Sequence, residues 1–254
     1  MAKKIAVSLR KGGSGKTTTA VNLATALHLK GKKTLLIDLD PQANATISVG
    51  IDPLSLTKHI NTLFTDINIK TEEAIMKTSF GLPILPSHPD LADTEAGMRA
   101  TQIGLLKGLL EPIDGIFDYI VIDTPPAESY LTVNAMAVAD EIVIPLQAHY
   151  LAMRGLQEAM EEIDEVKKGL NPKLKVAGIL PTMVSNRTNI AKTVMEAVRE
   201  AYGGLLYPFQ VDFSIKHTEA TLAGIPIVIY DPKHQGSLAY MQLADLVIKE
   251  GKND

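Results

Sequence analysis

A short glycine- and lysine-rich segment, Lys11–Thr19, constrains this chain more than any other part of its sequence. It reads Lys-Gly-Gly-Ser-Gly-Lys-Thr-Thr-Thr. The common phosphate-binding loop has the pattern Gly-x-x-x-x-Gly-Lys-[Ser/Thr], and its first glycine would fall at Arg10. A second lysine, Lys11, stands instead near the start of the segment, ahead of Lys16. The segment therefore predicts a phosphate-binding loop of an unusual kind, because glycine is only about 7% of an average chain and a chance match is rare.

The residues on either side of this loop supply the strand and the helix that such a loop needs. Ile5–Leu9 is a short apolar run typical of a buried parallel strand, and Thr19–Leu27 carries apolar residues at helical spacing. Glycines let the backbone curl so that successive N–H groups point at phosphate oxygens. The positive N-terminal end of the helix faces the same anion. We therefore expect nucleotide binding by Gly12, Gly13, Ser14, Gly15, Lys16, Thr17 and Thr18.

Side chains of this loop have predicted roles toward a triphosphate. Lys16 is expected to reach the β- and γ-phosphates, and the Thr17 hydroxyl is expected to bind Mg²⁺. Thr18 is placed to contact the α-phosphate. Lys11 has no role in an ordinary loop, where a second amine would add like-charge repulsion. From the spacing alone, a solvent-facing Lys11 and a functional one remain equally open.

Composition limits the classes of protein that this chain can belong to. Its 254 residues fit one α/β domain or two small ones. The absence of cysteine excludes disulfides, thiolate zinc sites and iron–sulfur clusters, and is typical of a reducing cytoplasm. The net charge of −4 means that any contact with DNA needs a local basic face. No apolar run approaches the roughly 20 residues that span a bilayer.

Strand-like apolar runs alternate with helical patterns along the whole chain. The expected strands are Lys4–Leu9, Lys33–Leu39, Leu82–Leu85, Tyr119–Asp123, Glu141–Pro145, Lys175–Pro181 and Ile227–Ile229. The expected helices include Lys16–Leu29, Leu151–Lys168, Asn189–Tyr202 and Ser237–Lys249, with surface helix and loop over Asp52–Thr78. This alternation predicts an α/β fold with a mostly parallel, twisted sheet and helices on both faces. We expect it to form a single domain over residues 1–254, with ligands beyond the carboxyl ends of the strands.

Acidic residues stand at two of the expected strand ends. Asp38 and Asp40 are two positions apart, so their side chains leave the strand on the same side. One of them could orient water or accept its proton, and the alternative is a carboxylate pair that caps the turn before Pro41. Asp123 ends the apolar run Tyr119–Asp123 in the pattern of a Walker B strand. It is expected to bind Mg²⁺.

Several segments together resemble one family. Lys11–Thr18 resembles the deviant Walker A motif of the ParA/MinD family of ATPases, and Asp38–Thr46 resembles its Asp-x-Asp-Pro-Gln-x-Asn-[Ala/Thr]-Thr motif. Thr124-Pro125-Pro126 is similar to the family's switch II segment. Gly178–Asn189 and Gly224–Pro232 match further family stretches, so that the resemblance covers nearly the whole chain. It is greatest to the short ParA-type partition and positioning ATPases that lack an N-terminal DNA-binding extension.

The resemblance implies an ATPase that hydrolyses ATP to ADP and phosphate with Mg²⁺, and that forms a homodimer in its ATP state. Lys11 would cross the dimer interface and contact the phosphates bound to the other subunit. Asp40 would position the attacking water, so that Lys11, Lys16 and Asp40 are the expected catalytic residues. Asp38 would support the switch and the metal shell together with Thr17 and Asp123.

The resemblance also implies partners. The ATP dimer would bind DNA without sequence preference through Arg187 and Lys216, with Lys192, Lys233 and Lys249 as further candidates; solvated surface lysines are the alternative. A ParB-like or other adaptor would stimulate hydrolysis. The cargo would be a plasmid, a chromosome or a body such as a bacterial microcompartment. We expect a cytoplasmic protein that associates with the nucleoid when ATP is bound, without a membrane partner.

Two other functions remain open from the sequence. A metabolic P-loop enzyme, such as a dethiobiotin synthetase-like ligase or kinase, would need a second substrate pocket, for which no polar signature is visible. A MinD-like membrane-associated ATPase would need a C-terminal amphipathic helix, and Ala244–Asp254 lacks aromatic anchors and a basic–apolar division. The family's Pro-Arg-Asn segment near adenine corresponds to Val211–Ser214, so the sequence assigns no base-contacting residue.

Overall fold

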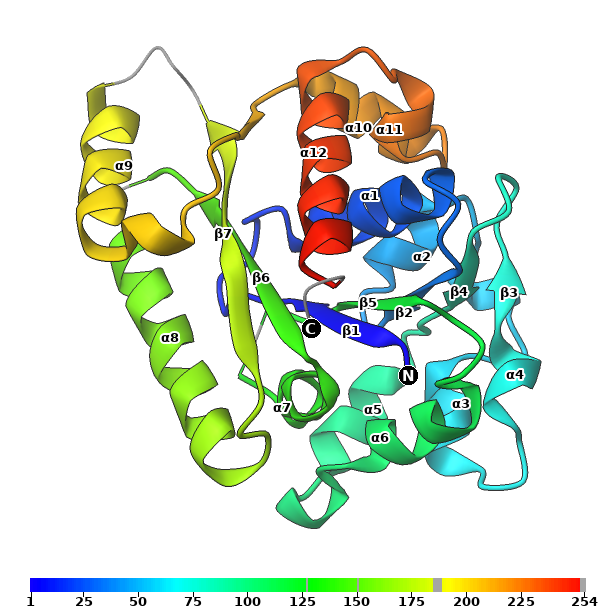
Figure 1. Ribbon diagram of the computed structural model, residues 1–254. Coiled ribbons are helices and arrows are strands. Elements are labelled where there is room, and N and C mark those ends of the chain that lie inside the picture. Colours follow the sequence, from blue (N-terminus) through cyan, green and yellow to red (C-terminus); the bar gives the residue numbers. More distant parts are fainter. Residues whose placement is uncertain (127, 150, 185–188, 252–254) are drawn as a thin grey trace.

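One sheet of eight strands forms the centre of the described part of the molecule (Figure 1). The computed structural model describes residues 1–126, 128–149, 151–184 and 189–251. The strand order is β3-β4-β2-β5-β1-β6-β7-β8, and only the β3–β4 pair is antiparallel among these strands. The strands are β1 (Lys3–Val7), β2 (Thr34–Asp38), β3 (Met76–Lys77), β4 (Pro83–Leu85), β5 (Tyr119–Asp123), β6 (Glu141–Gln147), β7 (Lys175–Val184) and β8 (Val211–Asp212).

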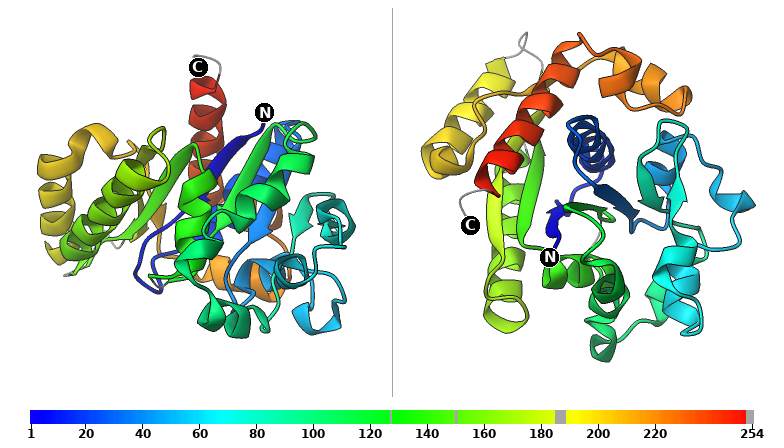
Figure 2. Two further views of the ribbon diagram at one scale, coloured as in Figure 1. Left: turned by 90° about the horizontal axis from the view of Figure 1, so that it is seen from below. Right: turned by 45° about the vertical axis from the view of Figure 1, so that its right-hand side comes forward.

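Helices cover both faces of this sheet, as Figures 1 and 2 show from three directions. One face carries α1 (Lys16–Leu29), α2 (Asn44–Ser48), α10 (Ile215–Leu222), α11 (Ile227–Tyr230) and α12 (Gln235–Glu250). The other carries α3 (Ile60–Thr65), α4 (Thr71–Ala74), α5 (Leu91–Gly97), α6 (Leu105–Leu110), α7 (Tyr130–Val138), α8 (Ala152–Gly169) and α9 (Asn189–Tyr202). The predicted fold class is therefore confirmed.

The central strands are apolar throughout because both of their faces are buried. In β1, Ile5 and Val7 pack on the α1 side, whereas Ala6 packs on the α7 side. In β5, Val121 packs on the α1 side of the sheet and Ile122 packs on the α7 side. Successive side chains of a strand point to opposite faces, so a continuous apolar run requires a helical layer on each side.

The long elements match the sequence prediction closely, and one short element contradicts it. The helix Lys16–Leu29 and the strand Tyr119–Asp123 have the predicted bounds. Ile227–Ile229, predicted as a strand, belongs instead to the helix α11. Its apolar side chains are buried against α1 and α12, and Val228 N donates to Asn22 Oδ1 (3.2 Å). A short apolar run has no periodicity that separates a strand from a helix, and here helix packing decides.

The segment Asp52–Thr78 differs in part from its predicted surface character. It holds α3, α4 and β3, and Ile60 and Leu63 are buried in the core below the sheet. The two strands that the sequence did not predict, β3 and β8, have two residues each and lie at the sheet edges. Such short strands are fixed by their neighbours and leave almost no pattern of their own.

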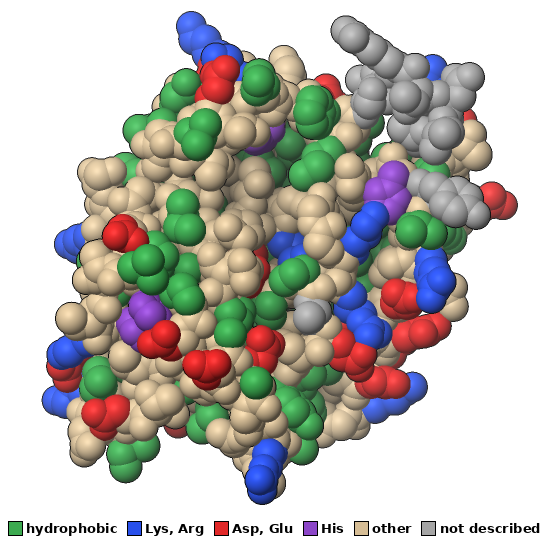
Figure 3. Space-filling model, turned by 180° about the vertical axis from the view of Figure 1, so that it is seen from behind, with side chains coloured by type: hydrophobic (Ala, Val, Ile, Leu, Met, Phe, Trp, Pro, Cys, Tyr) green, Lys and Arg blue, Asp and Glu red, His purple; other side chains and the backbone are tan. Residues whose placement is uncertain are grey.

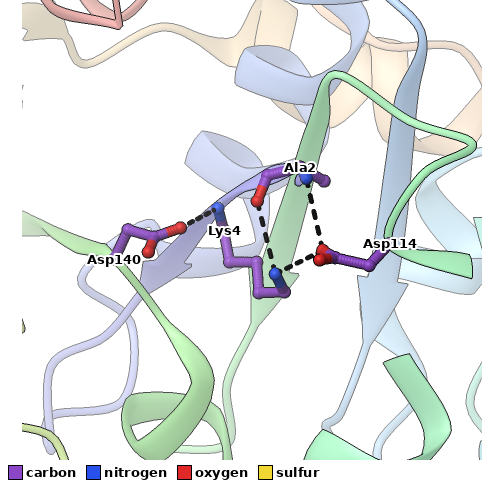
Figure 4. Close-up of polar contacts among 4 residues, drawn as sticks. All are labelled: Ala2, Lys4, Asp114 and Asp140. Atoms are coloured by element: carbon purple, nitrogen blue, oxygen red, sulfur yellow. Dashed lines mark hydrogen bonds and ion pairs between the residues drawn. The ribbon is translucent and has the colours of Figure 1, made fainter. Parts of the chain in front are cut away.

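A polar cluster anchors the start of β1 at the amino edge of the sheet (Figure 4). Lys4 Nζ lies 2.5 Å from Asp114 Oδ1 and donates to the Ala2 carbonyl oxygen (3.3 Å). The Lys4 backbone N donates to Asp140 Oδ2 (2.7 Å), and Ala2 N donates to Asp114 Oδ1 (3.2 Å). These bonds join β1 to the segments that precede β5 and β6. They help to fix the direction of β1, which leads into the glycine loop.

Across the described residues, every helix is too short or too polar to cross a bilayer.

Candidate active site

The glycine loop follows β1 at the carboxyl edge of the sheet and leads directly into α1. Gly13 and Gly15 have φ values of +71° and +87°, which side chains other than glycine rarely adopt. Thr182, near the end of β7, donates from Oγ1 to the Ser14 carbonyl oxygen (2.7 Å). The loop is thus held by a neighbouring strand as well as by its own turn, and it precedes the positive end of α1.

Lys16 lies under this loop with only 6% of its surface exposed. Its Nζ donates to the Lys11 carbonyl oxygen (2.9 Å). Burial lowers the pKa of Lys16, while Asp123 and Asp40 nearby raise it in part. The amine is therefore a buried cation beside two carboxylates, at the point where the loop N–H groups gather.

The cations at the start of the loop contact two other segments of the site. Lys11 Nζ lies 3.5 Å from His149 Nδ1, in the segment that follows β6. Arg10, where the usual loop would have glycine, forms an ion pair with Glu128 in the segment after β5. The contact of Lys11 with the phosphates bound to a second subunit stays a prediction.

Asp38 and Asp123 lie side by side at the ends of β2 and β5, because the strand register pairs them directly. Both residues are fully buried. Asp38 Oδ2 accepts from Thr46 N (2.8 Å) and Thr46 Oγ1 (2.7 Å), and its Oδ1 accepts from Asp40 N (3.1 Å). Burial raises the pKa of Asp38 to about 6, against the effect of these bonds. The contacts make Asp38 a support for the turn that carries Asp40; its predicted place in the metal shell stays a prediction.

Asp123 has the opposite environment. Neither of its carboxylate oxygens has a hydrogen-bond partner in the described ranges. Burial raises its pKa well above the ordinary value, and the neighbouring Asp38 adds to the shift, while the nearby Thr17 hydroxyl opposes it. A buried carboxylate without a partner is costly unless a cation neutralises it, so this position fits Mg²⁺.

The protein would supply few of the ligands of such a metal site. No cluster of three or more His, Cys, Asp or Glu side chains suited to a metal occurs among the described residues. Asp123 and Thr17 would therefore hold Mg²⁺ together with phosphate oxygens and water, as this ion prefers. When bound, the ion would neutralise negative charge on the phosphates.

Asp40 is held at both its side chain and its backbone. Its Oδ1 accepts from Gln42 N (2.9 Å), and its carbonyl oxygen accepts from Ser87 Oγ (2.7 Å). Only 5% of Asp40 is exposed, and burial raises its pKa while the charge of Lys16 lowers it. The carboxylate is thus a fixed base candidate at the edge of the loop, as the sequence predicted; its role stays a prediction.

A cavity of about 260 Å³ adjoins the loop at Gly15 and Thr18. Its other walls include Met183 at the end of β7, Phe213 after β8, His217 on α10 and Tyr240 on α12. The sequence assigned no base-contacting residue, and His217 and Tyr240 lie outside every motif that it offered, because these walls come from four separate segments. A larger cavity of about 990 Å³ lies at the amino edge of the sheet, near Lys3 and Asp140, away from the loop.

The predicted DNA-contacting residues are only partly tested by the structure. Arg187 lies outside the described residues. Lys216 Nζ pairs with Glu219 Oε2 (2.8 Å) and lies 5.8 Å from the centre of the Tyr230 ring. Lys233 precedes α12 and Lys249 lies in its last turn, roughly 24 Å apart along 16 residues of helix. A patch that includes Lys216 and both of these lysines would be wide, and the DNA contacts stay predictions; the face in Figure 3 shows acidic and basic side chains interspersed.

A glycine loop with a buried lysine, an adjacent Walker B aspartate and a parallel sheet define the class of P-loop nucleoside triphosphatases. Comparisons with known proteins specify this further. A family model described as "AAA domain" matches residues 2–176. The chromosome partitioning protein ParA of Myxococcus xanthus is 40% identical, over 96% of this chain and 87% of that protein. The sporulation initiation inhibitor protein Soj of Bacillus subtilis is 36% identical, over 99% of this chain and all of that protein.

A solved structure has the same fold. Cobyrinic acid a,c-diamide synthase from Mycobacterium smegmatis, with bound ADP and magnesium, is 33% identical with a TM-score of 0.84, over 99% of this chain and 96% of that one. The chain belongs to the ParA/MinD family of deviant Walker A ATPases. It is an ATPase that uses ATP and Mg²⁺.

Proposed function

We propose that this ParA-like ATPase partitions DNA or positions a cellular cargo through an ATP-dependent homodimer that binds DNA non-specifically. The observation that carries the proposal is the second lysine, Lys11, in a chain that is similar along its whole length to proteins named ParA and Soj. An amine at the rim of the loop can reach phosphates held by a facing copy, and charge-assisted contacts of this kind are strong. ATP would then join two protomers.

The proposed cycle uses the residues at the loop in a fixed order. Gly12 to Thr18 bind ATP, with Lys16 at the β- and γ-phosphates and Thr17 and Asp123 at Mg²⁺. Nucleotide must draw the Lys16 amine away from the Lys11 carbonyl oxygen, which accepts its bond in this structure. The same exchange frees the start of the loop, so nucleotide binding and the placement of Lys11 are coupled.

Hydrolysis is proposed to occur when Asp40 orients water at the γ-phosphate. Gln42 N donates to the Asp40 carboxylate and Ser87 Oγ donates to the Asp40 carbonyl oxygen, while Thr46 donates to the supporting Asp38. These hydrogen bonds also connect Asp40 to α2, so the position of α2 would change with the nucleotide bound at the site. An adaptor protein that adjusts this connection would stimulate hydrolysis and release the dimer.

DNA binding is proposed to depend on dimerisation. A monomer with a net charge of −4 has weak attraction for DNA, but a dimer doubles any local basic surface that includes Arg187 and Lys216. Two linked patches bind far more tightly than one. We further propose that residues 1–254 act as one domain in the cytoplasm, at the nucleoid when ATP is bound and without a membrane partner.

The decisive experiment measures the mass of the protein by light scattering during gel filtration with Mg²⁺ and either ATP or ADP. Asp40→Ala should hold ATP and form a stable dimer, because water is no longer oriented. Lys11→Ala in the Asp40→Ala background should bind ATP with about the same affinity but stay monomeric. Lys107→Ala in that background, at an exposed position of α6, is a control that should dimerise. A dimer that forms without Lys11 would contradict the proposal.

A second candidate function is ATP-dependent ligation, because the similar Mycobacterium smegmatis structure is named as a synthase of an amide product. This function predicts ATP turnover that requires an acid substrate and an amine donor such as glutamine. The ParA-like function predicts turnover that DNA and an adaptor increase. ATPase assays with cobyrinic acid plus glutamine, and separately with plasmid DNA, distinguish the two.

A further inference from the structure

The segment that follows Asp123 packs along the start of the glycine loop. Thr124 Oγ1 donates to the Val7 carbonyl oxygen (2.9 Å) at the end of β1, and Thr124 is fully buried. Two residues further on, a Cβ added to Gly12 would lie 3.9 Å from Pro126 Cβ, so the two backbones lie close together. A movement of this segment is therefore transmitted to the loop.

Arg10 adds a charged contact between the same two segments. Its guanidinium pairs with Glu128, whose side chain is 67% exposed. An ion pair with so much exposure to solvent contributes little stability, so it can break and re-form easily. The pair connects the residue before Lys11 to the segment after Asp123. Arg10 stands where the ordinary loop has glycine, and neither the phosphate-binding pattern nor the proposed cycle gives its side chain a role.

A second carboxylate, Glu162 in the middle of α8, faces the same arginine. Only 9% of Glu162 is exposed, and its Oε1 is buried without a hydrogen-bond partner among the described residues. Burial raises the pKa of Glu162, the charge of Arg10 lowers it, and the charges of Glu128 and Glu165 raise it further. A buried carboxylate needs a cation more than an exposed one does. Arg10 thus has two carboxylates within its reach, and it pairs with the exposed one.

From this arrangement we infer that Arg10 is a positioning residue, which exchanges Glu128 for Glu162 when Mg²⁺ and ATP bind and so moves the start of the loop. The segment that begins at Asp123 shifts when this carboxylate is neutralised, and Glu128 leaves the guanidinium. Arg10 then neutralises Glu162, an interaction that stabilises the nucleotide-bound state only. The inference rests on the ATP site and not on dimerisation or DNA binding, so it can fail while the proposed function stands.

The test measures the Kd for a non-hydrolysable ATP analogue by calorimetry, with Mg²⁺ and separately with EDTA. Glu128→Gln removes the partner of the nucleotide-free state, so the analogue should bind up to about fivefold more tightly with Mg²⁺, as for an exposed ion pair. Glu162→Gln removes the partner of the bound state, so the analogue should bind about tenfold more weakly with Mg²⁺. Neither variant should change binding in EDTA, because the exchange depends on the neutralisation of Asp123.

The opposite directions of these two shifts distinguish an exchange from a general effect of charge. Each variant removes one negative charge from the neighbourhood of the phosphates, and that change alone would tighten binding of the analogue in both. It would also do so in EDTA. Weaker binding by Glu162→Gln, seen only with Mg²⁺, is therefore the result specific to the exchange.

Arg10→Gln provides an independent measurement through a double-mutant cycle. Without the guanidinium, neither Glu128→Gln nor Glu162→Gln should change the Kd any further. Glu161→Gln is the matched control and should bind the analogue like the wild type, because Glu161 is exposed on α8 and accepts from Gln157 Nε2 (2.9 Å) on the same helix. Thermal unfolding without nucleotide identifies any loss of fold, and Glu162→Gln should melt no lower than the wild type because a buried charge is removed.

Three results would overturn the inference. The first is a shift of the Kd in the same direction for Glu128→Gln and Glu162→Gln, and the second is a shift of equal size with Mg²⁺ and with EDTA. The third is a loss of affinity by Arg10→Gln that persists in EDTA, because Arg10 would then contact the phosphates itself.

Discussion

At the scale of single residues, the site is a group of buried charges that the protein alone does not neutralise. Asp38 and Asp123 are both fully buried on adjacent strands, and Lys16 lies beside Asp123. Hydrogen bonds stabilise Asp38, but the oxygens of Asp123 have no partner in the described part of the chain. Asp123 is thus the residue whose charge most requires a metal ion.

Asp123→Asn should stabilise the metal-free protein at pH 8 and abolish its response to Mg²⁺–ATP. The pKa of Asp123 is raised in the folded state, so its contribution to stability is complete below pH 4 and is lost as the pH rises through the folded pKa. Asparagine resembles the protonated form and avoids this loss. In EDTA we expect a melting temperature about 2–4 °C above the wild type at pH 8, as for roughly 1 kcal/mol.

The difference between Asp123→Asn and the wild type should shrink toward pH 4. Added Mg²⁺ and ATP should raise the melting temperature of the wild type only. Asp164→Asn, on an exposed position of α8, is the control and should follow the wild type at each pH. Equal melting of Asp123→Asn and the wild type at pH 8 in EDTA would count against a buried, unpaired carboxylate.

Thr46 is the residue that connects Asp38 to the loop of Ser87. Its hydroxyl donates to Asp38 Oδ2 (2.7 Å) and accepts from Ser87 N (3.0 Å), and the residue is fully buried. Thr46→Val keeps the shape but leaves two buried groups short of a bond, which costs about 1–3 kcal/mol of stability.

We expect Thr46→Val to lower the rate of ATP hydrolysis by about tenfold or more, because Asp40 is no longer held, while the Kd for ATP changes little. Rapid-quench measurements of hydrolysis and equilibrium binding of ATP would separate the two effects. Thr25→Val, also fully buried but bonded only within α1, is the matched control. A weaker Kd with an unchanged rate would contradict a role for Thr46 in positioning Asp40.

At the scale of elements, the loop before α11 packs against the end of α2 with no space for side chains. A Cβ on Gly224 would lie 2.7 Å from the Gly50 Cα, and Gly224 has a φ of +66°. The close approach brings the α10–α11 connection onto the helix that follows Asp40. Two glycines thus connect the α10–α12 layer to the segment that follows Asp40.

Gly224→Ala should therefore be strongly destabilising. Crowding in a packed region costs about 1–3 kcal/mol, and a left-handed backbone adds an amount of similar order for alanine. We expect a melting temperature at least about 5 °C below the wild type by calorimetry. Gly108→Ala on the exposed side of α6, where an added Cβ meets no atom within 4 Å, should be neutral or slightly stabilising. Similar melting of the two variants would refute the close contact.

At the scale of the whole molecule, the face in Figure 3 carries charges of both signs side by side. Basic side chains are interspersed with acidic ones on the face in Figure 3, and Lys216 already has Glu219 as a partner. Non-specific DNA affinity depends on the number of phosphates neutralised at once. Under the proposed function, association of copies would be the step that creates a DNA-binding surface.

DNA binding by the ATP-bound Asp40→Ala protein should depend steeply on salt, and Lys216→Ala should reduce that dependence. Each lost phosphate contact lowers the slope of log K against log salt by about one. Fluorescence anisotropy with DNA of unrelated sequences would measure the slope and its lack of sequence preference. Lys107→Ala, on α6 on the opposite face of the sheet, is the control. An unchanged slope for Lys216→Ala would remove Lys216 from the DNA-binding surface.

The sequence by itself determined the parts of this protein whose chemistry is local. A phosphate-binding turn needs glycines and a lysine at fixed spacing, so Lys11–Thr19 identified the loop and α1 without further information. The apolar run Tyr119–Asp123 likewise predicted a doubly buried strand with a carboxylate at its end, because strand burial and strand periodicity are properties of neighbouring residues.

Only the tertiary structure decided what depends on contacts between distant segments. The register of β2 and β5 pairs Asp38 with Asp123, and hydrogen bonds from Thr46 then separate a supported carboxylate from an unpaired one. Packing on α1 made Ile227–Ile229 helical, and four separate segments enclose His217 and its cavity. Such features leave no pattern in the chain, because burial and desolvation arise only when remote residues exclude water together.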